Sequence, residues 1–265
     1  MCKANPPALR RTSTPIMSMV RTAVIPTIVT TTATIMDPSA AEADASLMPL
    51  MLWLSPAFPV GSFAYSHGLE WAVETGDVHD ARSLGGWLVD LFSLGAPRAD
   101  AILFAEAFHA AEAGDWTALL AVNALAVALG ASSERRLETT AQGAAFVAAA
   151  RGPWDCEPLR KLAPEDRIAY PVAVAAAAAG HGLALEPSLQ AFVLALAANA
   201  VSAVVRLGPI GQTDGQKILA ALLPRLRGLA RDAAQSTLAD LGSAAFRSDI
   251  AAMRHETQYS RLFRS

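Results

Sequence analysis

Cysteine is nearly absent from this chain of 265 residues: there are two, Cys2 and Cys156, and neither lies in a Cys-x-x-Cys pair. Two such residues cannot build a disulfide framework, so a disulfide-stapled secreted fold is excluded and a reducing compartment is expected. Aromatic residues make up only 6% of the chain, whereas alanine, with 57 copies, is the commonest residue. Because alanine favours helices and is depleted from strands, an all-β sandwich is excluded.

Charged residues are also scarce, at 17% of the chain against 53% hydrophobic residues. That balance excludes a wholly disordered chain. The net charge of −3 lacks the basic field of a nucleic-acid-binding protein, so we expect no nucleic-acid partner. The negative charge lies in the body of the chain, whereas residues 242–265 carry four arginines against two acidic residues. An acidic body therefore ends in a basic tail.

The first 46 residues differ from the rest. Residues 1–36 carry four basic side chains and no acidic one, with ten serines or threonines and four prolines. That composition does not build a core, and Met36 and Met48 offer later starts. We therefore interpret residues 1–46 as a disordered or mis-assigned extension. An organelle transit peptide has a similar composition, and a secretory signal fits less well because Pro26 interrupts the apolar run.

From Leu47 onward, apolar residues recur with helical spacing, and no strand pattern stands out. Asp80 and Asp115 are placed to cap helices, and glycines and prolines separate the helical stretches. We predict an all-α fold: a single compact helical bundle of about 8–10 helices over residues 47–241, followed by a tail at 242–265. Four local predictions follow: a helix Tyr65–Glu74, a connector over 152–170, an N-cap at Thr213 and a break or restart at Pro224.

One stretch, Ser188–Leu207, is apolar nearly all round, so it is either buried in the protein or spans a membrane. It contains Gln190, Asn199 and Ser202, and it is short for crossing a bilayer. We predict a buried central helix, no membrane partner and a cytoplasmic protein.

Motifs for catalysis are largely missing. The glycine-rich stretch Gly208–Lys217 lacks the Gly-Lys-Ser/Thr succession that a phosphate loop needs. His255 and Glu256 resemble the start of a zinc-protease motif, but Tyr259 stands where the second histidine is required. No Gly-x-Ser-x-Gly elbow is present. The absence of a catalytic constellation favours a binding or scaffold protein over an enzyme.

His67 and Glu70 are three residues apart, so within the predicted helix they share one face. A salt-linked or solvated pair is the favoured interpretation, and a metal site is the alternative. An unrelated helical metalloenzyme using His67, Glu70 and His255 is the weakest hypothesis for the whole chain. We expect no stably bound metal or cofactor.

The tail is unlike an ordinary chain end, which is small, polar and mobile. Residues 253–264 combine methionine, tyrosine, leucine and phenylalanine with three arginines. Tyrosine and arginine are typical anchors of protein interfaces. The composition therefore favours docking on a partner or a sister subunit, and folding back onto the chain's own body is the alternative.

Three blocks give the chain a family resemblance. They are Leu52–Glu74 (LWLSPAFPVGSFAYSHGLEWAVE), Val205–Leu219 (VRLGPIGQTDGQKIL) and Met253–Ser265 (MRHETQYSRLFRS), with a weaker likeness at Ala131–Glu138 (ASSERRLE). In this order they resemble the urease accessory protein UreF family, over about 47–265. The resemblance implies an all-α, non-enzymatic homodimer that joins a UreD/UreH-type accessory protein and the GTPase UreG. That complex delivers nickel to apo-urease, so nickel is its cargo and GTP is bound by the partner.

The resemblance also suggests which residues bind partners. The tail residues implied to contact the UreD-type protein are Arg254, His255, Glu256, Tyr259 and Arg261. Residues of the other two blocks, implied to lie near the working face or the nickel passage of the complex, are Tyr65, Glu70, Arg206 and Gln212. An alternative function is a GTPase-activating protein with an arginine finger, Arg254 or Arg206, because such a residue stabilises transition-state charge.

Overall fold

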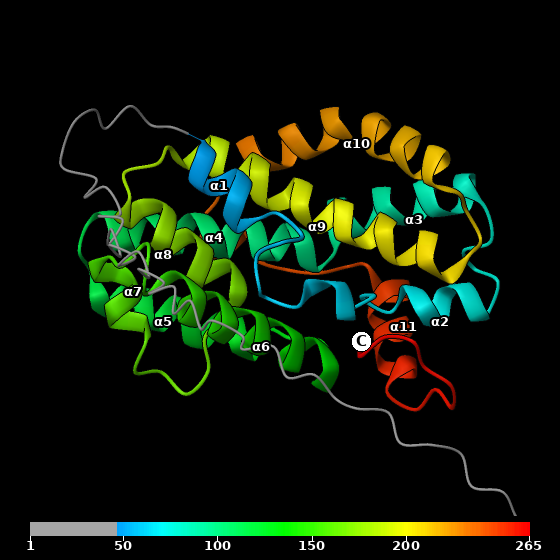
Figure 1. Cartoon of the computed structure of the whole chain (residues 1–265), viewed down its shortest axis with the longest axis horizontal. Helices are drawn as coiled ribbons and strands as arrows, with labels where there is room; N and C mark the ends of the chain where they lie inside the picture. Colours follow the sequence, from blue (N-terminus) through cyan, green and yellow to red (C-terminus); the bar gives the residue numbers. More distant parts are fainter. Residues whose placement is uncertain (1–46) are drawn as a thin grey trace, which may run out of the picture. The chain divides into compact units, whose positions relative to one another are not determined.

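The computed structural model describes residues 47–265, and the predictions made for residues 1–46 lie outside the described residues. The described part forms eleven α-helices and two 3-10 helices, with no strand among them (Figure 1). The α-helices are α1 (Met48–Trp53), α2 (Leu69–Glu74), α3 (Ala81–Leu94), α4 (Ala96–Glu112), α5 (Trp116–Ala128), α6 (Ser133–Ala150), α7 (Glu157–Leu162), α8 (Tyr170–Gly180), α9 (Leu185–Leu207), α10 (Gln212–Ala233) and α11 (Phe246–His255), and the 3-10 helices are η1 (Ser62–Ala64) and η2 (Leu238–Asp240). The predicted all-α bundle is confirmed, and three of its helices, α1, α2 and α7, have only six residues each.

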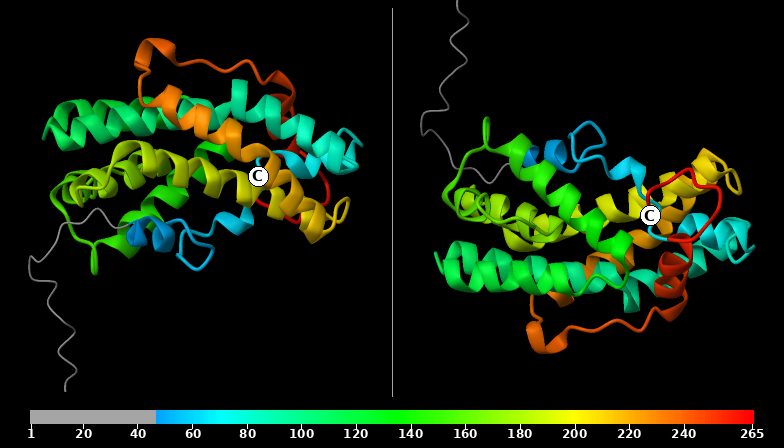
Figure 2. Two further views of the ribbon diagram at one scale, coloured as in Figure 1. Left: turned by 90° about the horizontal axis from the view of Figure 1, so that it is seen from above. Right: turned by 90° about the horizontal axis from the view of Figure 1, so that it is seen from below.

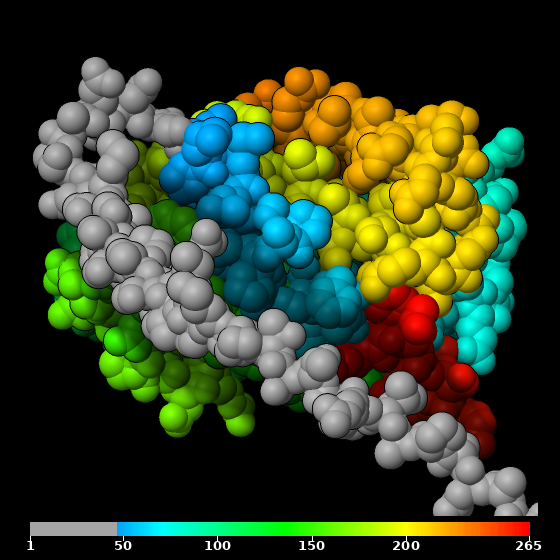
Figure 3. Space-filling model, viewed as in Figure 1, coloured from blue at the N-terminus to red at the C-terminus, as the bar shows by residue number. Residues whose placement is uncertain are grey.

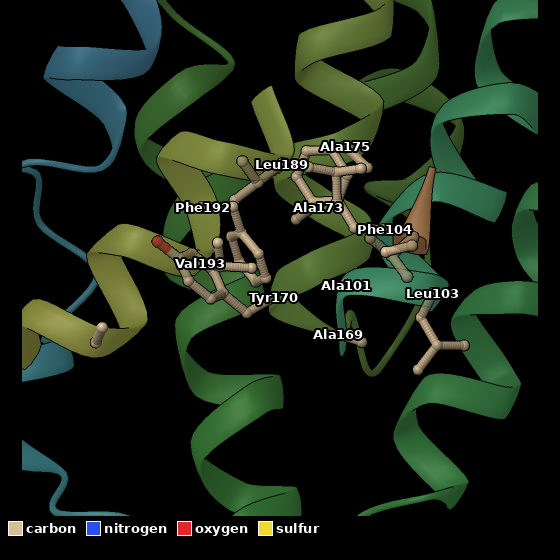
Figure 4. Close-up of a cluster of buried hydrophobic side chains, with 14 of the residues drawn as sticks. Ala101, Leu103, Phe104, Ala169, Tyr170, Ala173, Ala175, Leu189, Phe192 and Val193 are labelled. Carbon is tan, nitrogen blue, oxygen red and sulfur yellow. The ribbon is translucent and has the colours of Figure 1, made fainter. Parts of the chain in front are cut away.

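Helix α8 lies at the centre of the core. Every side chain from Tyr170 to Ala178 is buried, against α4, α6 and α7 among other helices. Alanine side chains let neighbouring helices approach closely, and large rings fill the space between them (Figure 4). The ring of Phe192 lies 5.2 Å from that of Phe104 and 5.7 Å from that of Tyr170, measured between centroids. Small and large side chains thus interlock around α8.

The apolar stretch Ser188–Leu207 forms most of α9. This helix is the one helix of the described part that is long and apolar enough to cross a membrane. It packs against α10, α4, α2 and α8, and half of its apolar window is buried there. The helix therefore packs into the body as predicted, but it is half-buried, and the fully buried central position belongs to α8.

Helix starts follow the sequence signals at two positions. The Asp80 carboxylate accepts the main-chain N–H of Ser83 at 2.7 Å, and Asp115 accepts that of Ala118 at 2.9 Å. Each contact satisfies one of the free N–H groups at a helix start.

The predicted helix Tyr65–Glu74 is wrong in its first part, because α2 begins only at Leu69. His67 and Gly68 adopt left-handed backbone angles, with φ of 57° and 78°. A left-handed residue cannot continue a right-handed helix, so the chain turns sharply before α2.

Two further local predictions also fail, at Thr213 and Pro224, and the predicted connector is confirmed with one addition. The N-cap of α10 is Gly211, and Thr213 lies inside the helix rather than capping it. The helix continues through Pro224 without a break, since Leu222 and Leu226 on either side are buried and hold it in place. The connector over 152–170 contains the short helix α7.

The chain returns from α10 to the other end of the bundle through residues 234–245 (Figure 2). This connection runs beside α4, and the main-chain N–H of Ala244 donates to the carbonyl of Leu94 at 2.8 Å. It leads into α11, which packs against α2 and α6. The three blocks of the sequence resemblance thereby meet, since α2, the end of α9 and the residues after α11 adjoin one another (Figure 1).

Candidate functional site

The C-terminal segment, residues 242–265, folds back onto the approach to α2. The N–H of Arg264 donates to the carbonyl of Ala64 at 2.8 Å, and the N–H and hydroxyl of Ser66 donate to Ser265 at 2.5 Å. The end of the segment, red in Figure 3, lies at the surface beside the yellow end of α9. In this chain the segment thus takes the folded-back arrangement, and docking on a partner stays a prediction.

Two buried glutamates of the body hold the segment through charged hydrogen bonds. Glu70 on α2 accepts the main-chain N–H groups of Leu262 at 2.6 Å and Phe263 at 2.9 Å. Glu134 on α6 accepts the guanidinium of Arg261 at 2.8 Å. Hydrogen bonds to an ionised carboxylate are shorter and stronger than those between neutral groups. The segment is therefore anchored at two separate helices.

A third buried glutamate, Glu138, lies one turn further along α6. It accepts the hydroxyl of Ser265 at 3.1 Å and pairs with Arg135 on the same helix. Burial is the largest single influence on the pKa of Glu138 and would raise it. The charge of Arg135, the neighbouring His67 and the hydrogen bonds from Ser265 and Arg135 together outweigh burial and leave the pKa below its ordinary value. The carboxylate thus remains an acceptor for the end of the segment.

His255, the last residue of α11, is completely buried between two of these carboxylates. Its Nδ1 lies 2.7 Å from Oε2 of Glu134, and its Nε2 lies 3.0 Å from Oε2 of Glu70. The ring therefore bridges α6 and α2 from α11.

Glycine at position 68 permits this close approach of α11 to α2. A Cβ atom placed there would lie 2.7 Å from the main-chain nitrogen of Ala252, and the residue's φ of 78° also disfavours side chains. Two independent constraints therefore require Gly68.

Glu256 caps α6 from outside that helix. Its Oε1 accepts the main-chain N–H of Ser133 at 2.7 Å and lies 3.4 Å from that of Glu134. Hydrogen bonds from Ser133 hold the pKa of Glu256 below its ordinary value. Glu256 thereby fixes the start of the helix whose next side chain, Glu134, holds His255.

His67 does not share a face with Glu70, so the predicted pairing is wrong. Its left-handed backbone places it before α2, where the ring contacts Arg135 and lies 3.4 Å from Oε1 of Glu138. Burial lowers the pKa of His67 to about 4. The ring is neutral at pH 7 and accepts a hydrogen bond from the arginine at Nδ1.

The residues predicted around the nickel passage lie in different environments. Arg206 stacks on the ring of Phe263, with Cζ 4.4 Å from the centroid, and donates to the carbonyl of Phe63 at 2.6 Å. Tyr65 is buried, and Gln212 is exposed at the first turn of α10. Arg206, Tyr65 and Glu70 therefore adjoin the seated segment, whereas nothing joins Gln212 to it.

Two predicted tail residues face outward. The Arg254 side chain is exposed and makes no hydrogen bond or ion pair within residues 47–265, and Tyr259 is fully exposed. An exposed apolar stripe runs along α11 at helical spacing: Phe246, Ile250 and Met253.

A partly open pocket of about 110 Å³ lies beneath the first part of the segment, residues 242–252. Its lining is mostly apolar, with polar groups from His67, Asp100, Arg135 and Asp249 among its walls. Within the described residues, no group of three histidine, cysteine, aspartate or glutamate side chains has the arrangement of a metal site. The pocket therefore has a mostly apolar lining with some polar groups, and its described residues form no evident metal-ligand set.

Sequence reasoning missed the two acceptors on α6, Glu134 and Glu138, and the cation between the helices, Arg135. All three lie in the weaker block Ala131–Glu138, which carried no site prediction. Their spacing was a usable signal, because Glu134 and Glu138 are four residues apart and so share one helix face.

Comparisons with known proteins find relatives that match most of the chain. A protein-family model described as UreF matches residues 78–223. The chain is 56% identical over 229 residues to the urease accessory protein UreF of Xanthobacter autotrophicus, covering 86% of this chain and 94% of that relative. It is 56% identical over 218 residues to the same protein of Methylobacterium radiotolerans, with 82% and 95% covered.

A third relative is the urease accessory protein UreF of Rhodopseudomonas palustris, 52% identical over 230 residues, with 86% of this chain and 95% of the relative covered. Identity above half along nearly the whole of each relative exceeds what a shared fold alone would require. The chain belongs to the UreF family of urease accessory proteins.

Proposed function

We propose that this chain is a non-enzymatic scaffold for urease maturation. It joins a UreD/UreH-type accessory protein and the GTPase UreG in the complex that inserts nickel into apo-urease. Nickel is the cargo of that complex and GTP is bound by UreG, so the chain itself holds no resident cofactor. We place it in the cytoplasm and expect a homodimer.

The observation that carries the proposal is that the C-terminal segment is bound to the body on its inner side and exposes interface-type side chains on its outer side. Inward, buried glutamates fix its main chain and the side chains of His255 and Arg261. Outward, it presents Arg254, Tyr259 and the apolar stripe of α11. An exposed surface of aromatic, methionine and arginine side chains on a fixed backbone is typical of the core of a protein interface. This surface is where we expect the UreD-type protein to bind.

The buried ionisable groups support a scaffold rather than an enzyme. Glu70, Glu134 and His255 hydrogen-bond to one another and to the segment, and none of them is more than 9% exposed. A general acid or base must reach its substrate. These groups are instead used to hold the chain together.

Co-expression tests the proposal. The chain, the UreD-type protein and UreG from one source are purified through a tag on the UreD-type protein, and the mass of the complex is measured. A Tyr259→Ala, Arg254→Ala variant should lose the UreD-type contact while keeping its helical signal. Arg231→Ala, an exposed arginine on α10, serves as the matched control and should assemble normally.

Urease activity and nickel content give the second readout. Urease produced with the double variant should contain little nickel, whereas the Arg231→Ala control should give the full content. Normal assembly and full nickel occupancy with the double variant would refute the docking surface. Full nickel occupancy in cells lacking the chain altogether would refute the maturation role.

The alternative function is stimulation of GTP hydrolysis on UreG by an arginine finger. Exposure favours Arg254 for this role, because Arg206 is engaged by a carbonyl and by the Phe263 ring. A finger is worth about 10³–10⁵ in rate. Loss of stimulated hydrolysis in Arg254→Ala, with UreG still bound, would support it, and unchanged hydrolysis would eliminate it.

A further inference from the structure

His255 occupies an unusual electrostatic position for a buried histidine. Its ring is 0% exposed, and each of its two nitrogens faces a carboxylate oxygen: Glu134 at 2.7 Å and Glu70 at 3.0 Å. The two acceptors come from different helices, α6 and α2, and the ring comes from α11. The contact therefore ties three elements together.

The number of protons in this cluster follows from its hydrogen bonds. A neutral imidazole has one N–H and one lone pair, whereas an ionised carboxylate only accepts. With a neutral ring, the unprotonated nitrogen would direct its lone pair at a carboxylate oxygen. Such a contact has no hydrogen bond and is costly in the protein interior. Only the doubly protonated ring donates to both glutamates.

Each of the two carboxylates also accepts hydrogen bonds from donors other than His255. Glu134 also receives the guanidinium of Arg261 at 2.8 Å, and Glu70 also receives the main-chain N–H groups of Leu262 and Phe263. With His255 protonated, two cations face two carboxylates and the charge of the cluster is balanced. Loss of one proton leaves it with one negative charge in excess.

We infer that His255 is a proton-dependent latch, which holds residues 256–265 on α2 and α6 while its ring is doubly protonated and releases them when it loses a proton. The charged groups that face the ring are Glu70 from α2 and Glu134 from α6, with Arg261 behind Glu134. The next carboxylate on α6, Glu138, is engaged by Arg135 and does not contact His255. All of these groups belong to this chain, so the latch requires no partner protein.

The direction of the pH effect follows from the protonated ring. The latch is closed where His255 carries two protons and the glutamates are ionised. Raising the pH removes the second ring proton, which one of the two contacts needs, and so opens the latch.

Two measurements on the unmodified full-length chain test the latch. The ¹⁵N shifts of the His255 ring report how many of its nitrogens are protonated, and amide hydrogen exchange of Leu262 and Phe263 reports whether the segment is seated. We expect two protonated ring nitrogens wherever the two amides are protected. Protection of the two amides, corrected for intrinsic exchange, should fall by about tenfold or more as the pH is raised and the second ring proton is lost. A singly protonated ring with protected amides, or loss of protection while the ring keeps both protons, would overturn the inference.

Glu134→Gln sharpens the test. The amide that replaces the carboxylate can donate to Nδ1 of a neutral His255, while its oxygen still accepts from Arg261. Residues 256–265 can therefore stay bound to α2 and α6 without the second ring proton. Amide protection in this variant should be independent of pH over the same range. A loss of protection as large as in the unmodified chain would contradict the latch.

His109→Gln is the matched control, because His109 is exposed on α4 and its ring lies near Phe108 and Glu112 on the same helix. It should keep the pH dependence of the unmodified chain, and a flat profile would show that the effect does not come from His255. If Glu134→Gln does not fold, the ring shifts of the unmodified chain still decide the question.

Discussion

The core around α8 and the C-terminal segment are held in place by different forces. Around α8, alanines and the rings of Phe104, Tyr170 and Phe192 are buried, and the contacts are apolar. The C-terminal segment buries Phe263 and a few alanines, and it is also held by hydrogen bonds to buried glutamates. The first kind of contact is non-directional and scales with area, whereas the second depends on geometry and on protonation.

The difference implies that the two regions can be separated energetically. A region fixed by a few charged hydrogen bonds can open without unfolding a core that is held by packing. The segment is therefore suited to exchange its inward contacts for others, while the bundle stays folded. Four substitutions test this comparison, ordered here from the largest expected effect to the smallest.

Phe192→Ala should give the largest loss of stability, because it removes a fully buried ring from the centre of the core. Replacing such a ring typically costs about 3–5 kcal/mol. Urea unfolding followed by circular dichroism measures the loss, which should affect the bundle and the segment together. A cost below about 1 kcal/mol would mean that packing around α8 does not dominate the stability of the body.

Gly68→Ala should disturb the junction between the two regions. The added Cβ would lie 2.7 Å from the main-chain nitrogen of Ala252, and the left-handed φ adds strain. We expect a cost of about 2–3 kcal/mol, with faster amide exchange in α11. Gly76→Ala is the control, because it has a similar φ of 79° and open space around it. Equal effects at both positions would show that the close approach at Gly68 is unimportant.

Glu70→Ala should loosen the segment and leave the core intact. It removes the acceptor of two main-chain N–H groups and one of the two partners of His255. Seating of the segment should weaken by about 2 kcal/mol, measured as faster exchange at Leu262 and Phe263. Equal acceleration in α8 would instead mean that the two regions unfold as one unit.

Glu256→Ala should have the smallest effect, about 1 kcal/mol, because it removes one cap from α6. Since hydrogen bonds lower the pKa of Glu256, its contribution is complete above the ordinary value of 4.5 and is lost as the pH falls through the lowered value. Urea unfolding at about pH 7 and about pH 3 should therefore show a larger difference between variant and parent at the higher pH. A difference of the same size at both values would rule out the charged cap.

The fold could be predicted from local sequence because helices are local structures. Alanine content, the caps at Asp80 and Asp115 and the apolar stretch of α9 each express a preference within a few residues. The failures occur where distant contacts override such preferences. Pro224 stays inside α10 because its neighbours are buried, and His67 leaves the helical path where α11 approaches.

The candidate site was less predictable for the same reason. His255 and Glu70 are 185 residues apart in the sequence, and nothing local indicates that they meet. The family resemblance pointed to Glu70, His255, Glu256 and Arg261, and it implied a partner contact for the last three. In this chain these four residues take part in the contacts between the C-terminal segment and the body, so the partner contact remains a prediction. Glu134 and Glu138 needed the three-dimensional structure.

Native-state hydrogen exchange in low concentrations of urea tests the separation of the two regions most directly. The amides of Leu262 and Phe263 should exchange through an opening that has a lower free energy and a weaker urea dependence than the opening of buried α8 amides such as that of Val174. That result would establish a segment that releases from an intact core. Exchange of all three amides with the same free energy and the same urea dependence would contradict the account.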